Sequence, residues 1–276
     1  MDKLQPDIRV FEPRSDFSSR RTRISINSGT LQASEAQAQY SPYCKQAFVP
    51  REPWREPTPD ERETLWSKNI PSEPGKWISI IRIPDDVLAP FERIQAATCK
   101  NEQLVTGLRN SPESRRGIEK FIDYITPLSA STEQPFEGAG ISVRSPNLKT
   151  GTFDYKTDCY VGLHLDGWYK RPLDERHLSP NRICVNLGLE DRYFLFINLS
   201  LQTIYGLSDM DRSTDPSTLG ASFMKHYPLY PVIRVRIATN EAYIAPTENI
   251  VHDGSTEGRA SLDLCLTVRG DFKSCF

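Results

Sequence analysis

Residues 160–166 read Tyr-Val-Gly-Leu-His-Leu-Asp, and this stretch decides how the rest of the chain is interpreted. If it is a β-strand, successive side chains point to opposite faces. His164 and Asp166 then share one face, while Leu163 and Leu165 point the other way, into packing. One strand therefore offers two metal-ligand side chains on one face, and a third ligand has to come from a second segment.

The chain offers few candidates for that third ligand, because it contains only four histidines. His177 and His226 lie in polar, irregular stretches and are interpreted as surface residues, whereas His252 follows a β-like segment. Two histidines and one carboxylate are the ligand set of a facial triad, which binds iron(II) and leaves coordination positions open. The sequence thus predicts that His164, Asp166 and His252 bind a metal; the simpler interpretation is a solvated pair at a strand end.

The segment after His252 alternates in polarity from Arg259 to Val268, after a turn that contains Gly254 and Gly258. Such a strand is ordinarily half-buried, with its polar face in water. In a small barrel the polar face lines the lumen instead, and Arg259 and Ser261 would then project beside His252. An arginine fork and a hydroxyl suit the carboxylate of a ligand.

The combination of His-x-Asp, a distal histidine and Arg-x-Ser resembles the iron(II)/2-oxoglutarate-dependent oxygenases over about residues 140 to 272. The resemblance implies a double-stranded β-helix (jelly-roll, cupin-like) core and a requirement for Fe(II), 2-oxoglutarate as cosubstrate and O2. It implies that His164, Asp166 and His252 are the catalytic metal ligands. It also implies that Arg259 binds the distal carboxylate of 2-oxoglutarate, with a hydrogen bond from Ser261. Arg259 follows His252 by fewer residues than in many members, so Arg269 is the alternative.

Secondary-structure signals fit a mainly β protein with flanking helices. Helical spacing is predicted for 85–99 and 112–125, after a strand at 78–83. From about residue 138 the pattern is β, and its segments suggest a sandwich or barrel: 182–187, 192–203, 232–239 and 241–245. We expect a polar, proline-containing N-terminal arm over 1–58, packed on the core or partly disordered, and an oxygenase domain over 59–276.

Composition excludes several classes of function. The chain has 276 residues and a formal net charge of -2, so no global basic field attracts nucleic acid. It contains no apolar run of membrane-spanning length, and its first residues do not resemble a signal peptide. Its six cysteines are scattered without a Cys-x-x-Cys pair, which predicts reduced thiols and a cytoplasmic protein.

The substrate is less defined by the sequence. A small molecule, such as an amino acid or a natural-product intermediate, suits a slightly acidic protein with many loops. Trp168, two positions past Asp166, is predicted to face the same pocket and contact the substrate; the alternative is a ring packed over a loop. The nucleic-acid dealkylases of this superfamily carry a second arginine where Cys265 stands here, which disfavours nucleic acid.

Other interpretations stay open at this point. The nearest is hydroxylation of a protein or peptide side chain, in which the first sixty residues would help to form a peptide groove. A hydrolase or isomerase that uses the same three ligands for zinc is another, and a non-catalytic jelly-roll binding protein is a third. The sequence leaves the oligomeric state open.

Overall fold

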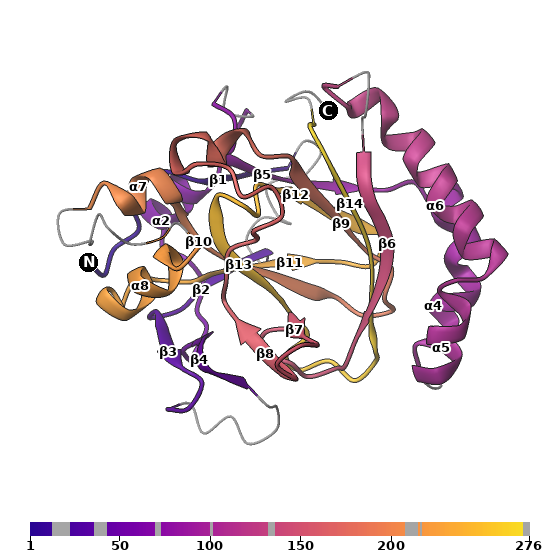
Figure 1. Cartoon of the computed structure of the whole chain (residues 1–276), viewed down its shortest axis with the longest axis horizontal. Helices are drawn as coiled ribbons and strands as arrows, with labels where there is room; N and C mark the ends of the chain where they lie inside the picture. The colour runs from indigo at the N-terminus through magenta and orange to yellow at the C-terminus, as the bar shows by residue number, and fades with distance from the viewer. Residues whose placement is uncertain are drawn as a thin grey trace.

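The computed structural model describes residues 1–12, 23–35, 43–69, 73–99, 102–131, 136–207, 215 and 217–272. Two β-sheets face each other at its centre, and helices cover their outer surfaces (Figure 1). The first sheet is mainly antiparallel, and its six strands lie in this order: β1 (Arg9–Phe11), β5 (Trp77–Arg82), β12 (Glu241–Ala245), β9 (Asn181–Asn186), β14 (Asp263–Gly270) and β6 (Phe136–Arg144).

The second sheet has four strands and carries one of the predicted metal ligands. Its strands lie in the order β13 (Ile250–Ser255), β10 (Arg192–Ser200), β11 (Ile233–Ile237) and β2 (Ile24–Ile26). A third sheet closes one end with β3 (Thr30–Gln32), β4 (Tyr43–Pro50), β8 (Cys159–Gly162) and β7 (Phe153–Asp154). From β9 to β14 the chain passes back and forth between the first two sheets: β9, β12 and β14 belong to the first, and β10, β11 and β13 belong to the second. This is the jelly-roll arrangement that the sequence predicts.

Side-chain alternation explains why these segments form a sandwich. In β10, Phe194 and Phe196 face the space between the sheets, whereas Leu195 and Ile197 pack outward under helices. In β14, Leu264 and Leu266 pack toward helices, and Cys265 faces inward. Because both faces of these strands are covered, their middle residues are apolar without interruption, from Phe194 to Ile197 and from Leu264 to Leu266.

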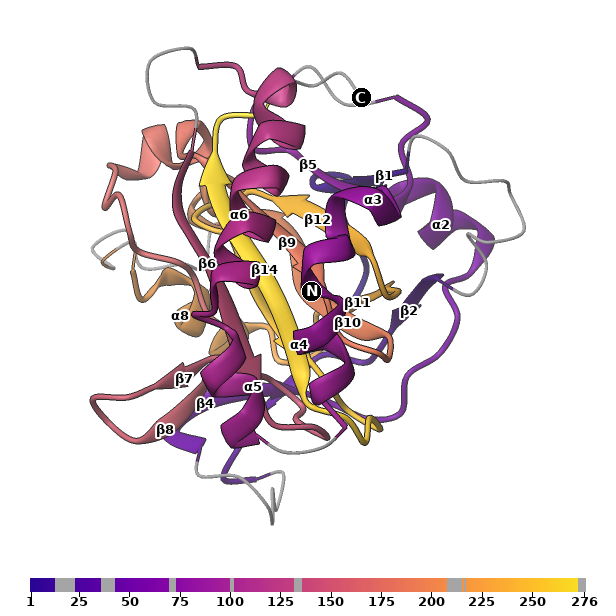
Figure 2. The same cartoon turned by 90° about the vertical axis from the view of Figure 1, so that its right-hand side faces the viewer.

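Helices fill the outer layers. Four cover the outer face of the first sheet beside β14 and β9 (Figure 2): α3 (Asp85–Leu88), α4 (Glu92–Ala97), α5 (Glu102–Leu108) and α6 (Pro112–Ile125). Short 3-10 turns lie between α3 and α4 and after α6, at Ala89–Phe91 and Thr126–Leu128. Against the second sheet pack α7 (Leu201–Tyr205) and α8 (Leu219–His226), while α2 (Pro59–Leu65) precedes β5. Ser111 caps α6 by accepting from the backbone N–H of Ser114, so this helix spans the predicted 112–125.

Several sequence expectations need revision. The strand predicted over 192–203 ends at Ser200, because the Ser200 hydroxyl accepts from the Thr203 backbone N–H and caps α7. The helix predicted over 85–99 is broken by Pro90 into α3, a 3-10 turn and α4.

The described part of residues 1–58 contributes to all three sheets: β1 and β2 extend the two main ones, and β3 and β4 join β8 and β7 in the third.

The prediction that all cysteines are reduced is wrong. Cys44 in β4 and Cys159 in β8 form a disulfide, which joins two strands that are 115 residues apart in sequence. The cysteines were too widely spaced in sequence to suggest this pair; the parallel pairing of β4 with β8 brings them together. Cys99, Cys184 and Cys265 are free thiols, and Cys275 lies outside the described residues. Among the described residues, no helix has the length and apolar character needed to cross a bilayer.

Candidate metal centre

The His-x-Asp segment lies just beyond the end of β8. Gly162 ends the strand with φ +77°, and a side chain there would collide with the Phe48 carbonyl oxygen. The chain then runs beside β13: His164 N–H donates to His252 O over 3.0 Å, and His252 N–H donates to His164 O over 2.8 Å. Two of the three predicted ligands are thus paired directly across the backbone, and Leu163 packs into the core on the opposite side, as the alternation predicts.

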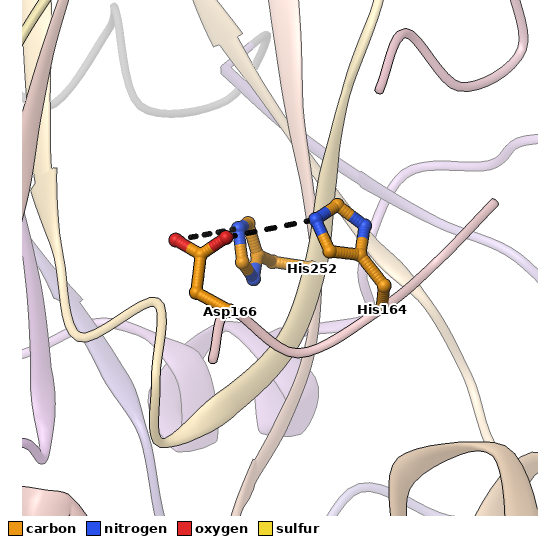
Figure 3. Close-up of side chains that lie close together, drawn as sticks. All are labelled: His164, Asp166 and His252. Carbon is orange, nitrogen blue, oxygen red and sulfur yellow. Dashed lines mark ion pairs between the residues drawn. The ribbon is translucent and has the colours of Figure 1, made fainter. Parts of the chain in front are cut away.

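The three side chains converge on one point (Figure 3). His164 Nε2 lies 3.7 Å from Asp166 Oδ1, and His252 Nε2 lies 3.9 Å from Asp166 Oδ2. One ligand atom from each residue lies within 4.8 Å of the others. These separations leave room for an ion between the three atoms, which come from one loop and one strand.

Hydrogen bonds fix the two imidazole rings from behind. His164 Nδ1 lies 2.9 Å from the Gly162 carbonyl oxygen, and His252 Nδ1 lies 3.2 Å from that of Ile250. A proton on each Nδ1 leaves Nε2 as the free lone pair that a metal requires. His252 Nε2 is buried and has no hydrogen-bond partner within the described part of the chain. A buried polar atom without a partner is costly, and a metal ion at this position would satisfy it.

The electrostatics of the site favour the metal-binding protonation states of His252 and Asp166. Burial lowers the pKa of His252 to about 3, so its imidazole is neutral. Burial opposes ionisation of Asp166, but the nearby ring of His164 and the positive charge of Arg182 hold its pKa well below the usual value. Burial also acts to lower the pKa of His164, yet the nearby carboxylates of Asp166 and Asp253 raise it overall. Asp166 is therefore an anion opposite two ring nitrogens.

Two arginines surround the triad: Arg182, which the sequence did not place there, and Arg269, which it offered only as the alternative to Arg259. Arg182 Nη2 and Arg269 Nη2 lie 3.0 and 3.1 Å from Asp166 Oδ2. Asp253, which directly follows His252, is buried and has Oδ2 3.8 Å from His164 Nδ1. Strand alternation places Arg182 on the same face of β9 as Cys184, and Arg269 on the same face of β14 as Cys265. Only the pairing of the strands shows that these two arginines contact the Asp166 carboxylate.

A narrow cavity of about 60 Å³ runs from His252 into the space between the sheets. Its lining includes three arginines, Arg144, Arg182 and Arg192, together with the inward residues Cys184 and Cys265. Arg192 is buried at the start of β10; its guanidinium contacts both thiols, Cys184 Sγ at 3.1 Å. It also lies near Asp263, with Nε 3.4 Å from Oδ1.

Gly254 leaves space for the Arg192 guanidinium. A Cβ on Gly254 would collide with Arg192 Nη2, so this position of β13 has to be glycine if the guanidinium is to lie against the strand. The sequence interpretation placed Gly254 in a tight turn; it lies in β13, and the turn falls at 256–259, where Arg259 N–H donates to the Thr256 carbonyl oxygen.

The structure does not bring Arg259 and Ser261 to the triad, and this corrects their expected position. β14 begins at Asp263, so both residues lie in the preceding loop rather than in the strand. Arg259 Nη2 donates to the Tyr193 hydroxyl over 2.6 Å. Ser261 N–H donates to Glu190, and its hydroxyl lies 3.4 Å from Cys99 Sγ. The alternation that continues back to Arg259 was read as strand, but the ladder of β14 with β6 starts only at Asp263.

The other residues considered from the sequence lie as follows. Trp168 is 70% exposed, and the Arg269 guanidinium carbon lies 4.8 Å from its ring centre. His177 contacts Gln202, and His226 contacts the carbonyl oxygen of Ser222, so neither approaches the triad.

Comparisons with known proteins find distant structural similarity and no match in sequence. No family model matches the chain, and no curated protein matches it in sequence. Among solved structures, the chain is similar to the Kdo hydroxylase KdoO, a non-haem Fe(II) and α-ketoglutarate dependent dioxygenase, in its cobalt(II) complex. The TM-score is 0.41 at 14% identity, with 72% of this chain and 80% of that chain covered. The apo form gives the same values, and the complex with succinate and Fe(III) gives a TM-score of 0.39 at 13% identity.

Proposed function

We propose that the protein is an iron(II)- and 2-oxoglutarate-dependent dioxygenase that hydroxylates a small molecule. The observation that carries this proposal is the combination of the triad with a cavity that leads from His252 to a buried arginine. Such a triad holds iron(II) while leaving positions for other ligands. A guanidinium at the far end of that cavity suits the distal carboxylate of 2-oxoglutarate.

In this proposal, His164, Asp166 and His252 hold the metal. Bound iron(II), with 2-oxoglutarate and O2, supplies the oxidation of an unactivated C–H bond, and succinate and carbon dioxide are the other products. The chain's own residues fix the ligand geometry: the two backbone carbonyls set the ring orientations, and two guanidiniums hold Asp166 as a carboxylate. The sandwich excludes bulk water from the inner side of the site, because His252 is 2% exposed.

We assign the distal carboxylate of 2-oxoglutarate to Arg192 instead of Arg259. The Arg192 guanidinium lies against Gly254, two residues along β13 from His252, which corresponds to roughly 7 Å of strand. A dicarboxylate attached to the metal at one end could reach a group at that distance. The cavity of about 60 Å³ is smaller than this cosubstrate, so Arg192 has to exchange its contacts with the two thiols for the carboxylate.

The other elements of the sequence interpretation remain proposals. The substrate is a small molecule, with an amino acid or natural-product intermediate as the starting expectation, and Trp168 is one of its contacts. A cytoplasmic location was inferred from reduced cysteines, and the Cys44–Cys159 disulfide removes that support.

The proposal is tested by following succinate formation from 2-oxoglutarate in air, with protein reconstituted with iron(II). Succinate should form with the wild-type protein, even slowly without substrate, and should be absent without iron or in His252→Ala. Metal analysis of the protein after reconstitution is the control for loading. Iron-loaded, folded wild-type protein that forms no succinate would contradict the proposed activity.

A further inference from the structure

A second cavity, of about 330 Å³, opens beside the metal centre. It shares Arg182 and Thr267 with the narrow inner cavity, and its other walls include Trp168, Tyr169 and Arg269. Because Arg182 and Arg269 both contact Asp166, the floor of this cavity adjoins a metal ligand. A molecule in the second cavity would therefore lie next to the metal without occupying the inner cavity.

The floor of this second cavity carries more positive than negative charge. Two guanidiniums share a single carboxylate oxygen, Asp166 Oδ2. Arg269 is 6% exposed, and its Nη1 is buried without a hydrogen-bond partner among the described residues. A buried, charged donor without an acceptor is costly, so this nitrogen points to an acceptor that a ligand would supply. Asp166 does not supply it, because its Oδ2 accepts from Nη2 of Arg269 and not from Nη1.

One wall of the cavity is an exposed aromatic ring that the backbone holds in place. Trp168 is 70% exposed, yet its loop is anchored by Glu248, a carboxylate that is 1% exposed. Glu248 accepts from the backbone N–H of Trp168 over 2.6 Å and from that of Tyr169 over 2.9 Å, and it pairs with Arg176. The ring is thus positioned without being buried, with Arg269 over it. Such a surface offers the body of a ligand an apolar contact.

The rim of the cavity carries the opposite charge. Glu137, on β6, lies opposite Arg269 in the β6–β14 register and is exposed. Its carboxylate accepts a hydrogen bond from the Tyr169 hydroxyl. No ion pair links Glu137 to Arg269 among the described residues. The charge of Glu137 at the rim therefore does not neutralise Arg182 and Arg269 at the floor of the cavity.

We propose, building on the function proposed above, that this second cavity binds the substrate to be oxidised, and that this substrate is a small molecule with a carboxylate. The carboxylate binds Arg269 Nη1 and the neighbouring Arg182, while the body of the molecule lies along Trp168. The cosubstrate 2-oxoglutarate binds in the inner cavity, with its distal carboxylate on Arg192. The two anionic ligands therefore bind different arginines.

The test uses the fluorescence of Trp168, isolated as the difference between wild type and Trp168→Phe, in metal-free protein at low ionic strength. Quenching by the anion iodide is compared with quenching by neutral acrylamide. A unit charge about 5 Å away changes the local concentration of a monovalent anion in water by roughly three- to fourfold. We expect the iodide-to-acrylamide ratio to fall by about threefold in Arg269→Gln and to rise in Glu137→Gln. Arg236→Gln is the matched control and should leave the ratio unchanged, because Arg236 pairs with Asp191 outside both cavities.

A pair of probes then tests the chemical class. Phenylacetate should protect Trp168 from iodide, and phenylacetamide, which has the same body without the charge, should not. Equal protection by both compounds, no protection by phenylacetate, or an iodide ratio that is the same in wild type, Arg269→Gln and Glu137→Gln would each overturn the proposal. Glu137 is exposed, so its variant keeps the test valid if Arg269→Gln does not fold.

This readout needs neither iron nor 2-oxoglutarate, so its failure is distinct from failure of the proposed activity. Succinate formation without iodide selectivity would support the proposed oxygenase activity and contradict the proposal that the substrate has a carboxylate. Selectivity without succinate formation would leave an anion site on a protein of another function.

Discussion

The assignment of the 2-oxoglutarate carboxylate to Arg192, instead of Arg259, gives the sharpest prediction. Arg192→Gln removes a buried guanidinium from the inner cavity. Arg259→Gln instead removes a guanidinium that lies in the loop before β14 and donates to the Tyr193 hydroxyl. Loss of one partner of a buried charge pair costs about 2–5 kcal/mol, and about 1.4 kcal/mol corresponds to a tenfold change in affinity. Because Arg192 first has to give up its contacts with Cys184 and Asp263, we take the lower end, a loss of roughly 30- to 100-fold in affinity for 2-oxoglutarate.

The assay is an anaerobic titration of iron-loaded protein with 2-oxoglutarate, followed by its visible absorbance. The affinity for iron itself should be nearly unchanged in both variants, because neither arginine contacts a metal-ligand side chain. Arg192→Lys, which keeps the charge, should recover part of the loss, and thermal unfolding of each variant controls for misfolding. A folded Arg192→Gln protein with wild-type affinity, or a loss of affinity in Arg259→Gln alone, would refute the assignment and restore the interpretation made from the sequence.

Three further perturbations test the structure. Gly254→Ala should weaken 2-oxoglutarate binding without changing iron affinity, since the added methyl group collides with Arg192; unchanged titration would contradict this contact. Glu241→Gln should lower the free energy of unfolding at pH 7 by about 1.5–3 kcal/mol, because Arg23 loses one charged hydrogen-bond partner but keeps its ion pair with Glu12. Burial opposes ionisation, but the bond with Arg23 lowers the pKa of Glu241. The stabilisation is therefore complete above the ordinary carboxyl pKa and is lost as the pH falls through the lowered value, so urea unfolding of the two proteins should converge in acid. Cys44→Ser opens a loop of 115 residues and should lower the free energy of unfolding in urea by about 2–4 kcal/mol. Wild-type protein treated with a reductant should show the same loss.

The metal ligands could be predicted from the sequence because their geometry is local. His164 and Asp166 are two residues apart, so any extended backbone places them on one side, even though β8 ends at Gly162. With only four histidines in the chain, His252 was the one candidate after a β-like segment. The jelly-roll was predictable for a related reason: alternating and apolar segments of strand length, such as β10 and β14, repeat from residue 138 onward.

The cosubstrate residue could not be predicted in the same way. Alternation in sequence continues from Val268 back to Arg259, but a strand exists only where a neighbour pairs with it, and the partners of β14 reach only to Asp263. Arg192 stands at the start of a strand and gives no local sign that its side chain turns inward. Its role depends on Gly254, sixty-two positions later in the sequence (254 − 192), and on the pairing of β10 with β13. Likewise, the Cys44–Cys159 disulfide follows from the pairing of β4 with β8, which no local pattern encodes.

The central claim is that His164, Asp166 and His252 hold an iron ion that 2-oxoglutarate can join. The most direct measurement is the anaerobic visible spectrum of the protein after addition of iron(II) and 2-oxoglutarate. A weak metal-to-ligand charge-transfer band is expected in wild type and in Arg259→Gln, and it should be absent in His252→Ala. Folded wild-type protein that shows no band at saturating iron(II) and 2-oxoglutarate would contradict the account and favour a zinc site or a protein without catalytic function.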